Sequence, residues 1–516
     1  MLSAVLMQGS PVARPVRRME RRNRSWMYRL VWGKPRPGGQ RYRERLPQLF
    51  ASVPVVQVDG DAPPADELRA LDLDFILVFG NDALGRSLIP FARHGVWAYS
   101  FGSWPRIRSN LVAFWEVYRR EPVTSAVLLR LTPDPDSATI LREAHLRTKP
   151  TFNSNREHIL ARIAHLPALV AIGLQLGDTT ALDAPPVKSS APVRQFPANL
   201  QMLTCPLRSF WFVARVSAGK FLRRDLWNIG VCEQPVSAFL DSRRPRARVR
   251  WLPQRSRSQF LADPFGVMHK GRLLLLCEHL DYGVGRGAIT ASTEPDLGEL
   301  AQIKIGPDKR IHLSYPCLFE HDGRIYCVPE THQAREVALY VMGETPSDWQ
   351  RVGPLLTDCE ISDPTVFQHE GRWWIAGADP GLNAPSADLY LWYSDSLAGP
   401  WTAHPANLVK TDVRASRPAG RPFVVDGVLY RPAQDGSRSY GGSVTINRVV
   451  ELTPTRFREE LATIVEPDRA SPFPDGLHTL CGVGDITLID SKRSVFALFE
   501  LWYAIVRRIR GGMSPV

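Results

Sequence analysis

The chain has 516 residues, a formal net charge of +12 at pH 7, 44% hydrophobic residues and 22% charged residues. These values are typical of globular proteins, so they exclude fibrous and wholly disordered classes, and the length predicts two to four domains of about 150 residues. No apolar run approaches the roughly 20 residues of a membrane span, and the residues after Met1 lack the pattern of a secretory signal. Seven cysteines without a C-x-x-C pair favour a reduced, cytoplasmic protein without structural zinc.

Nearly all the excess positive charge lies in one N-terminal segment. Residues 14–45 hold twelve Lys or Arg against two acidic residues, a difference of +10. We expect residues 1–45 to form a solvated basic arm. The alternative is that this arm contacts anionic lipid headgroups. No helix-turn-helix or zinc-finger spacing accompanies the arm, so we expect no specific nucleic-acid partner.

Residues 46–176 alternate strand-like and helix-like patterns, which predicts an α/β domain. Expected strands occupy residues 53–58, 75–79, 95–101 and 125–131, and expected helices occupy residues 65–71 and 155–176. Residues 177–203 are rich in Ala, Pro and Ser with little periodicity, and we interpret them as a linker.

From residue 204 onward the chain repeats a β-strand template. The repeats begin at Ala262-Asp263-Pro264, Ser314-Tyr315-Pro316, Ser362-Asp363-Pro364 and Gly420-Arg421-Pro422, at Pro-to-Pro spacings of 52, 48 and 58 residues. Each Pro leads to a Gly and then to a second apolar strand. A period near 50 with several short strands predicts a β-propeller over residues 204–500, and we favour five blades. Trp211–Val216 and Trp227–Val231 are expected as outer strands that close the ring, and Gly482–Phe499 as a looser last unit with Asp485 at the acid position.

Residues at the start of each innermost strand converge on the propeller axis. This predicts that Asp263, Asp363 and Asp485 surround one funnel, with Glu330, Arg417 and Arg421 nearby. Two carboxyl groups that face each other can act as base and acid on a glycosidic bond. The alternative is that each Asp-Pro only starts a strand or turn.

These blade motifs resemble the five-bladed propeller of glycoside hydrolase family 43 and its invertase and levansucrase relatives. The resemblance implies that Asp263 is the catalytic base and that Asp363 is a second acid, which modulates a pKa or stabilises the transition state. The family's general-acid glutamate is missing, because residues 415–422 read Ala-Ser-Arg-Pro-Ala-Gly-Arg-Pro. Glu330, at the end of a second strand, is the candidate to replace this glutamate, on the condition that its side chain points into the funnel. His478 resembles the family's histidine near a bound calcium or water. Two interpretations stay open: calcium binds in the funnel near His478, or His478 is only a packed core residue.

A second resemblance covers residues 204–500. Trp227-Asn-Ile-Gly-Val231, Phe260–Phe265, Tyr315-Pro316, Pro329-Glu330 and His478-Thr479 are similar to the N-terminal domain of glucosamine inositolphosphorylceramide transferases. In the plant proteins a separate domain carries the transfer chemistry, so glycosyl transfer is not simply implied here. The resemblance favours a carbohydrate or glycolipid partner, with Arg417 and Arg421 binding an anionic sugar, sugar phosphate or headgroup.

The first domain resembles the formyltransferase fold through residues 72–79, 95–101 and 114–117. That family uses an Asn-x-His and a downstream Asp. Ala98 and Ser100 stand at the first two positions here, and Asp136 matches the third. We therefore expect a degenerate scaffold in which Asp136 is a remnant.

At the C-terminus, residues 495–510 place apolar side chains at helical spacing, followed by three arginines and Gly511-Gly512. This predicts an amphipathic helix that packs on protein or lies on an anionic membrane.

Three functions remain open for the whole chain: a glycosidase or glycosyl-transferring enzyme, a sugar-binding scaffold without catalysis, and an amino-sugar formyltransferase. The residues Ala98 and Ser100 argue against the third.

Overall fold

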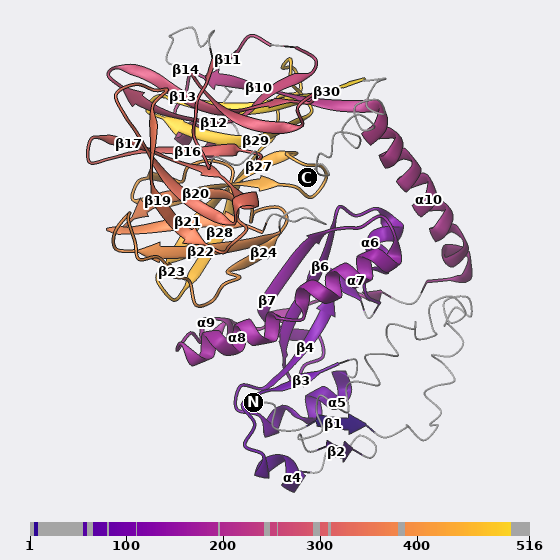
Figure 1. Cartoon of the computed structure of the whole chain (residues 1–516). Helices are drawn as coiled ribbons and strands as arrows, with labels where there is room; N and C mark the ends of the chain where they lie inside the picture. Colours follow the sequence, from indigo (N-terminus) through magenta and orange to yellow (C-terminus); the bar gives the residue numbers. More distant parts are fainter. Residues whose placement is uncertain are drawn as a thin grey trace. The chain divides into compact units, whose positions relative to one another are not determined.

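The computed structural model describes residues 5–8, 55–58, 65–79, 82–109, 111–194, 197–241, 248–254, 256–292, 300–307, 311–379 and 387–496. The chain divides into two compact units: unit 1 is Met1–Ala144 with Thr148–Ala214, and unit 2 is His145–Arg147 with Arg215–Val516 (Figure 1). The arginine-rich segment 14–45 and the tail after residue 496 lie outside the described residues, so both predictions made for them stay predictions.

Unit 1 combines short helices with a mixed sheet, and the last residues of its elements β7 and α10 belong to unit 2. Its elements are β1 (Val5–Gln8), β2 (Val55–Val58), α4 (Ala65–Ala70), β3 (Ile76–Val78), α5 (Asp82–Ser87), η1 (Ile89–Phe91), β4 (Val96–Phe101), β5 (Arg108–Ser109), α6 (Phe114–Arg119), β6 (Val123–Leu131), β7 (Ser137–Arg147), α7 (Phe152–Ile163), α8 (Leu166–Gln175), α9 (Thr180–Asp183), β8 (Val187–Lys188), β9 (Val193–Arg194) and α10 (Asn199–Leu222). β4 pairs in parallel with β3 and antiparallel with β6. The formyltransferase-like relationship stays a prediction.

The expected helix over residues 155–176 is two helices, α7 and α8. Together they cover Phe152–Gln175, a stretch that is long and apolar enough to cross a membrane by length and composition alone, contrary to the expectation that no run approaches this length. Phe152, Ile159 and Ile163 of α7 are buried, and α7 contacts β6. We therefore interpret α7 as a core helix of unit 1.

The predicted linker over residues 177–203 is wrong in part, because α9, β8, β9 and the start of α10 occupy it. The predicted strand Trp211–Val216 is also wrong, since these residues lie in the middle of α10. Their aromatic and β-branched side chains suggested a strand, but the 24-residue helix around them decides their conformation. Trp227–Val231 lies within a strand, β10, as predicted.

Unit 2 is a series of antiparallel strands. They are β10 (Arg223–Cys232), β11 (Val249–Trp251), β12 (Gln259–His269), β13 (Arg272–Asp281), β14 (Arg286–Ser292), β15 (Ala301–Gln302), β16 (Ser314–His321), β17 (Arg324–Glu330), β18 (Glu336–Met342), β19 (Trp349–Thr357), β20 (Ser362–His369), β21 (Arg372–Ala378), β22 (Asp388–Ser394), β23 (Thr402–Ala403), β24 (Lys410–Asp412), β25 (Phe423–Val425), β26 (Val428–Asp435), β27 (Ser443–Leu452), β28 (Phe457–Val465), β29 (Gly476–Val483) and β30 (Ile486–Phe496), with short 3-10 helices η2 (Val236–Leu240) and η3 (His332–Ala334).

These strands form a β-propeller. Four separate four-stranded sheets have the orders β11-β10-β30-β29, β12-β13-β14-β15, β16-β17-β18-β19 and β25-β26-β27-β28. The strands β20, β21 and β22 form a further antiparallel group, in which β23 and β24 both pair with β22. The innermost strands of successive strand groups contact one another. β12 contacts β16, and β16 contacts β20, as expected of neighbouring blades.

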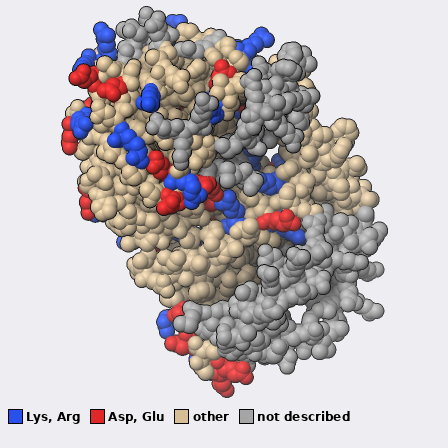
Figure 2. All heavy atoms as spheres, in the orientation of Figure 1, with Lys and Arg blue, Asp and Glu red and all other residues tan. Residues whose placement is uncertain are grey.

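The first and last strands of unit 2 share one sheet. β10 pairs with β30 over ten residue pairs, from Arg223↔Phe496 to Cys232↔Thr487. This pairing joins the two ends of the propeller, so the ring closes through a sheet built from both. Figure 2 shows acidic and basic side chains interspersed on the drawn face of the molecule.

Candidate functional site

The innermost strands begin with the same irregularity. Their pairing shifts register between Ala262 and Phe265, between Ser314 and Cys317, between Ser362 and Thr365, and between Leu477 and Leu480. Asp263, Tyr315 and Asp363 follow the first residue of three shifts, with φ of 51°, 44° and 51°. Non-glycine residues adopt this left-handed backbone at an energetic cost of about 1–3 kcal/mol, which is concentrated at functional sites in many proteins. The repeat therefore places its motif residues in an unusual conformation.

Buried carboxylates connect one blade to the next. The backbone N–H of Asp263 donates to Asp490 Oδ2 at 2.9 Å, and the N–H of Tyr315 donates to Asp263 Oδ2 at 3.3 Å. In the same way, the N–H of Asp363 donates to Glu330 Oε2 at 2.8 Å. Each acid thus satisfies a backbone donor that the register shift releases from the strand ladder.

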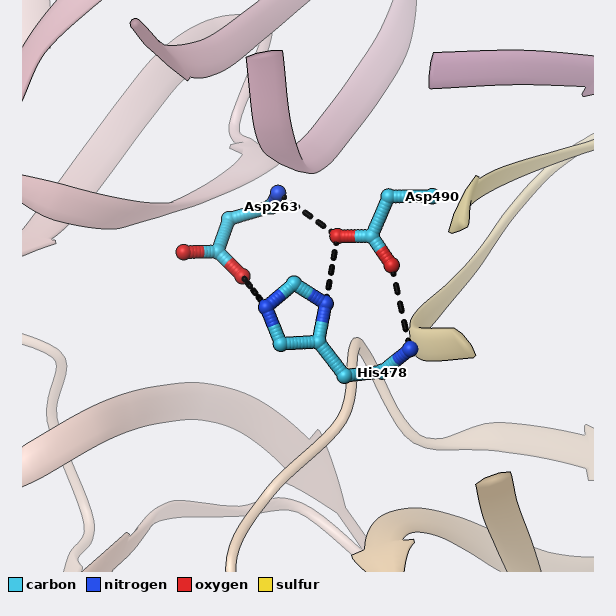
Figure 3. Close-up of side chains that lie close together, drawn as sticks. All are labelled: Asp263, His478 and Asp490. Carbon is cyan, nitrogen blue, oxygen red and sulfur yellow. Dashed lines mark hydrogen bonds and ion pairs between the residues drawn. The ribbon is translucent and has the colours of Figure 1, made fainter. Parts of the chain in front are cut away.

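An imidazole lies between two of these carboxylates (Figure 3). His478 Nδ1 lies 2.7 Å from Asp490 Oδ2, and His478 Nε2 lies 3.6 Å from Asp263 Oδ1. The ring stacks on Trp227, with centroids 3.9 Å apart. Burial lowers the pKa of His478, but the charges of Asp490 and Asp263 outweigh burial and raise it. The arrangement therefore favours the imidazolium form.

The same three side chains are the one group that the described residues offer as a metal site, with ligand atoms within 4.8 Å of one another. Calcium takes six to eight oxygen ligands. Here both ring nitrogens of His478 face carboxylates, and Asp490 Oδ1 already accepts the N–H groups of His478 and Thr479. This donor set fits a protonated histidine better than calcium, so the expectation of funnel calcium finds no support in it.

The two predicted arginines are engaged within the protein. Arg417 Nε donates to Asp363 Oδ2 at 2.5 Å and Nη2 donates to Oδ1 at 3.2 Å, and Gln434 donates to the same carboxylate at 2.8 Å. Arg421 Nη2 donates to the carbonyl oxygen of Gly266 at 2.7 Å. These contacts weaken the expectation that Arg417 and Arg421 form an anion-binding pair.

Glu330 is buried and held in its ionised form. His332 Nδ1 lies 2.8 Å from its Oε1, while its Oε2 accepts from the backbone of Asp363. Burial alone would raise the pKa, but the hydrogen bond with His332 and the charge of Arg417 lower the pKa of Glu330 to about 2. Glu330 therefore joins the predicted cluster as a carboxylate with a structural role.

Glu278 is a member of the cluster that the sequence analysis missed. It is buried, and burial together with the charges of Asp263 and Glu330 raises its pKa well above the usual range. Its Oε1 makes no hydrogen bond, although His312 Nε2 lies 3.4 Å away. The signal was available: Glu278 follows Asp263 by 15 residues, and Glu330 follows Tyr315 by the same interval.

Two further predicted residues lie away from this cluster. Asp485 is exposed in the turn between β29 and β30, so the expectation that it lines the funnel is wrong, and Asp490 on β30 occupies that place instead. The misplacement arose because the last repeat begins at His478-Thr479 and not at an Asp. Asp136 is exposed in unit 1 and pairs with Arg108 at 2.6 Å, where it can serve as a surface ion pair.

The fold and the cluster define a β-propeller with a carboxyl-rich centre. Residues 252–471 match the family of the N-terminal domain of glucosamine inositolphosphorylceramide transferase 1. That range includes Asp263, Glu278, Glu330, Asp363 and Arg417, and it ends before His478.

Individual plant relatives match the same part of the molecule. Glucosamine inositolphosphorylceramide transferase 1 of Oryza sativa subsp. japonica is 33% identical over 208 residues, and that of Arabidopsis thaliana is 32% identical over 207 residues. Each match covers 39% of this chain. The chain spans only 28% and 27% of the length of these two relatives.

Solved glycoside hydrolases are more distant. A family 117 enzyme of Zobellia galactanivorans is 15% identical, with a TM-score of 0.33 over 48% of this chain and 92% of its own. An exo-β-1,3-galactanase of Clostridium thermocellum is 14% identical, with a TM-score of 0.32 over 44% of this chain and 58% of its own. Similarities this low carry no argument about the site.

Proposed function

We propose that the propeller acts on a carbohydrate at the carboxyl cluster, by hydrolysis or transfer of a glycosyl group. The observation that carries this proposal is the contrast between two buried glutamates: the pKa of Glu330 is lowered to about 2, while that of Glu278 is raised well above its usual range. Carboxyl groups whose environments push their pKa values apart are the usual acid and base of glycosidic chemistry.

In this proposal Glu278 is the proton donor. Its raised pKa favours the protonated form, and its Oε1 makes no hydrogen bond within the protein. Asp263 is the proposed base, as the family resemblance implied; burial raises its pKa, and the charge of His478 acts in the opposite direction. Asp363, Glu330 and Asp490 position the others, because each is held by hydrogen bonds to neighbouring strands.

The charge of the cluster points to the kind of sugar. Five carboxyl groups (Asp263, Glu278, Glu330, Asp363 and Asp490) lie beside three histidines (His312, His332 and His478) and one arginine. Acidic groups therefore outnumber basic ones, which favours a neutral or amine-bearing sugar over an anionic one. The plant relatives are named for glucosamine, whose amine carries a positive charge at neutral pH. We therefore propose an amino sugar, free or on a glycolipid, as the substrate class.

The experiment compares the full chain with Glu278→Gln and Asp263→Asn variants on a panel of aryl glycosides and glucosamine-containing glycans. We expect turnover to fall by about 10²-fold or more in both variants, since each removes a proton-transfer group. Glu320→Gln, an exposed glutamate on β16, is the matched control. Turnover that is unchanged in both variants would reject the assignment.

A sugar-binding scaffold is the second candidate. It is favoured by the number of carboxylates that already hold neighbouring strands together, which is a structural use of the cluster. Calorimetry with glucosamine, N-acetylglucosamine and glucose 6-phosphate separates the two candidates. Binding without turnover, lost in Asp263→Asn, supports the scaffold.

The blade count forms part of the same proposal. We infer that β20 to β24 make up a fifth blade beside the four separate sheets. The pairing of β21 with both β20 and β22, and the register shift at Ser362, support this assignment, because they repeat the pattern of the other blades.

A further inference from the structure

We propose that α10 carries a surface that binds anionic lipid membranes. This inference is independent of the proposed carbohydrate chemistry, since α10 and the carboxyl cluster share no residue. It rests on the two opposite faces of one helix, labelled in Figure 1.

One face of α10 is docked. Met202 and Cys205 are buried in a cluster with Phe114, Trp115 and Phe152 of α6 and α7. Arg208 adds a contact on this side, with its guanidinium 4.7 Å from the ring centre of Tyr118. The orientation of the helix on unit 1 is therefore fixed by its own core contacts.

The opposite face is apolar and exposed. Leu200, Leu203, Leu207, Phe210 and Trp211 are 71%, 54%, 61%, 64% and 67% exposed. At 100° per residue they fall within an arc of about 100°, centred opposite Met202 and Cys205. Water-soluble proteins seldom leave five large apolar side chains in one stripe, so this face has a partner.

The composition of α10 selects a lipid surface as that partner. Residues 199–222 contain no Asp or Glu. Arg215 is exposed and borders the stripe, while Arg208 is exposed but contacts Tyr118. The rings of Phe210 and Trp211 lie 5.8 Å apart, side by side on the apolar face. Aromatic and leucine side chains flanked by arginines are typical of helices that lie in the headgroup region of anionic bilayers.

The experiment is co-sedimentation of the full chain with phosphatidylcholine vesicles, with and without phosphatidylserine. We expect binding only to the vesicles with phosphatidylserine, and weaker binding as salt is raised. Phe210→Ser with Trp211→Ser should reduce the bound fraction by about tenfold or more. Leu461→Ser with Ile464→Ser, two exposed apolar residues of β28, is the matched control and should bind normally.

Hydrogen exchange then locates the contact. Addition of phosphatidylserine vesicles should protect the amides of residues 200–214. The proposal is overturned if the Phe210/Trp211 variant binds vesicles as well as the unmodified chain, or if a chain ending at residue 496 loses all binding. It is also overturned if the stripe proves to be a dimer interface, seen as a dimer that this variant dissociates in sedimentation velocity without lipid.

Discussion

Glu330 illustrates how a buried carboxyl group can be held ionised by a neighbouring histidine and a backbone N–H group. One oxygen faces His332 Nδ1 and the other accepts the backbone N–H of Asp363, both at 2.8 Å. Because these contacts bring the pKa to about 2, below the ordinary value of 4.5, the carboxylate stabilises the folded state above pH 4.5. That contribution is lost as the pH falls through about 2.

We predict that Glu330→Gln destabilises the protein by about 3 kcal/mol at neutral pH, which is the linkage value of a pKa lowered by this amount in a fully buried group. Urea unfolding between pH 2 and pH 7 measures it. The difference from the unmodified protein should shrink as the pH falls below 4.5. Glu320→Gln is the control, and a difference that did not depend on pH would contradict the electrostatic explanation.

At the scale of elements, a single tyrosine joins three segments of the propeller. Tyr315, on β16, accepts a hydrogen bond from the N–H of Gly420 at 2.7 Å, so its own proton is available to Thr365 Oγ1 on β20 at 2.9 Å. The ring packs edge-on against Phe265 of β12, with centroids 4.8 Å apart. Blades are therefore joined by polar contacts at the site as well as by apolar packing.

Tyr315→Phe keeps the ring and removes the hydroxyl group. The buried N–H of Gly420 then loses its acceptor, and we predict a loss of about 1–3 kcal/mol in the free energy of unfolding. Chemical denaturation followed by fluorescence measures the change. Tyr326→Phe on the adjacent strand β17 is the control, and equal effects of the two substitutions would contradict a specific role for the hydroxyl group of Tyr315.

At the scale of the whole molecule, ring closure depends on the last strand. β30 pairs with β10 along its length and carries Asp490, which accepts the N–H groups of Asp263, His478 and Thr479. Repeat architectures bury each sheet only against its neighbours, so an open ring exposes the faces on both sides of the gap.

We therefore predict that a chain ending at residue 485 does not fold cooperatively, whereas a chain ending at residue 496, which keeps every described strand, does. Circular dichroism during heating and solubility after expression check this. A cooperative transition in the shorter chain would show that β10 and β29 suffice to close the propeller.

The sequence by itself determined the repeat. A Pro followed by a Gly at nearly constant spacing, then an apolar strand, is a local pattern with a period close to 50 residues. It predicted the propeller, a strand start near Asp363 and a strand end at Glu330, although not the position of Asp263 inside β12. These predictions succeeded because turn residues and strand alternation act over a few residues.

Only the tertiary structure decided which side chains meet. Glu278 joins the cluster, Asp490 takes the place expected for Asp485, and Arg417 forms an ion pair with Asp363. The sequence did not predict these contacts because they join strands up to 227 residues apart. The conformation of residues 211–216 was likewise decided by the docking of α10 through Met202 and Cys205, which overrides local strand preference. Local patterns carry no information on such contacts, since these form only once the chain has closed its ring.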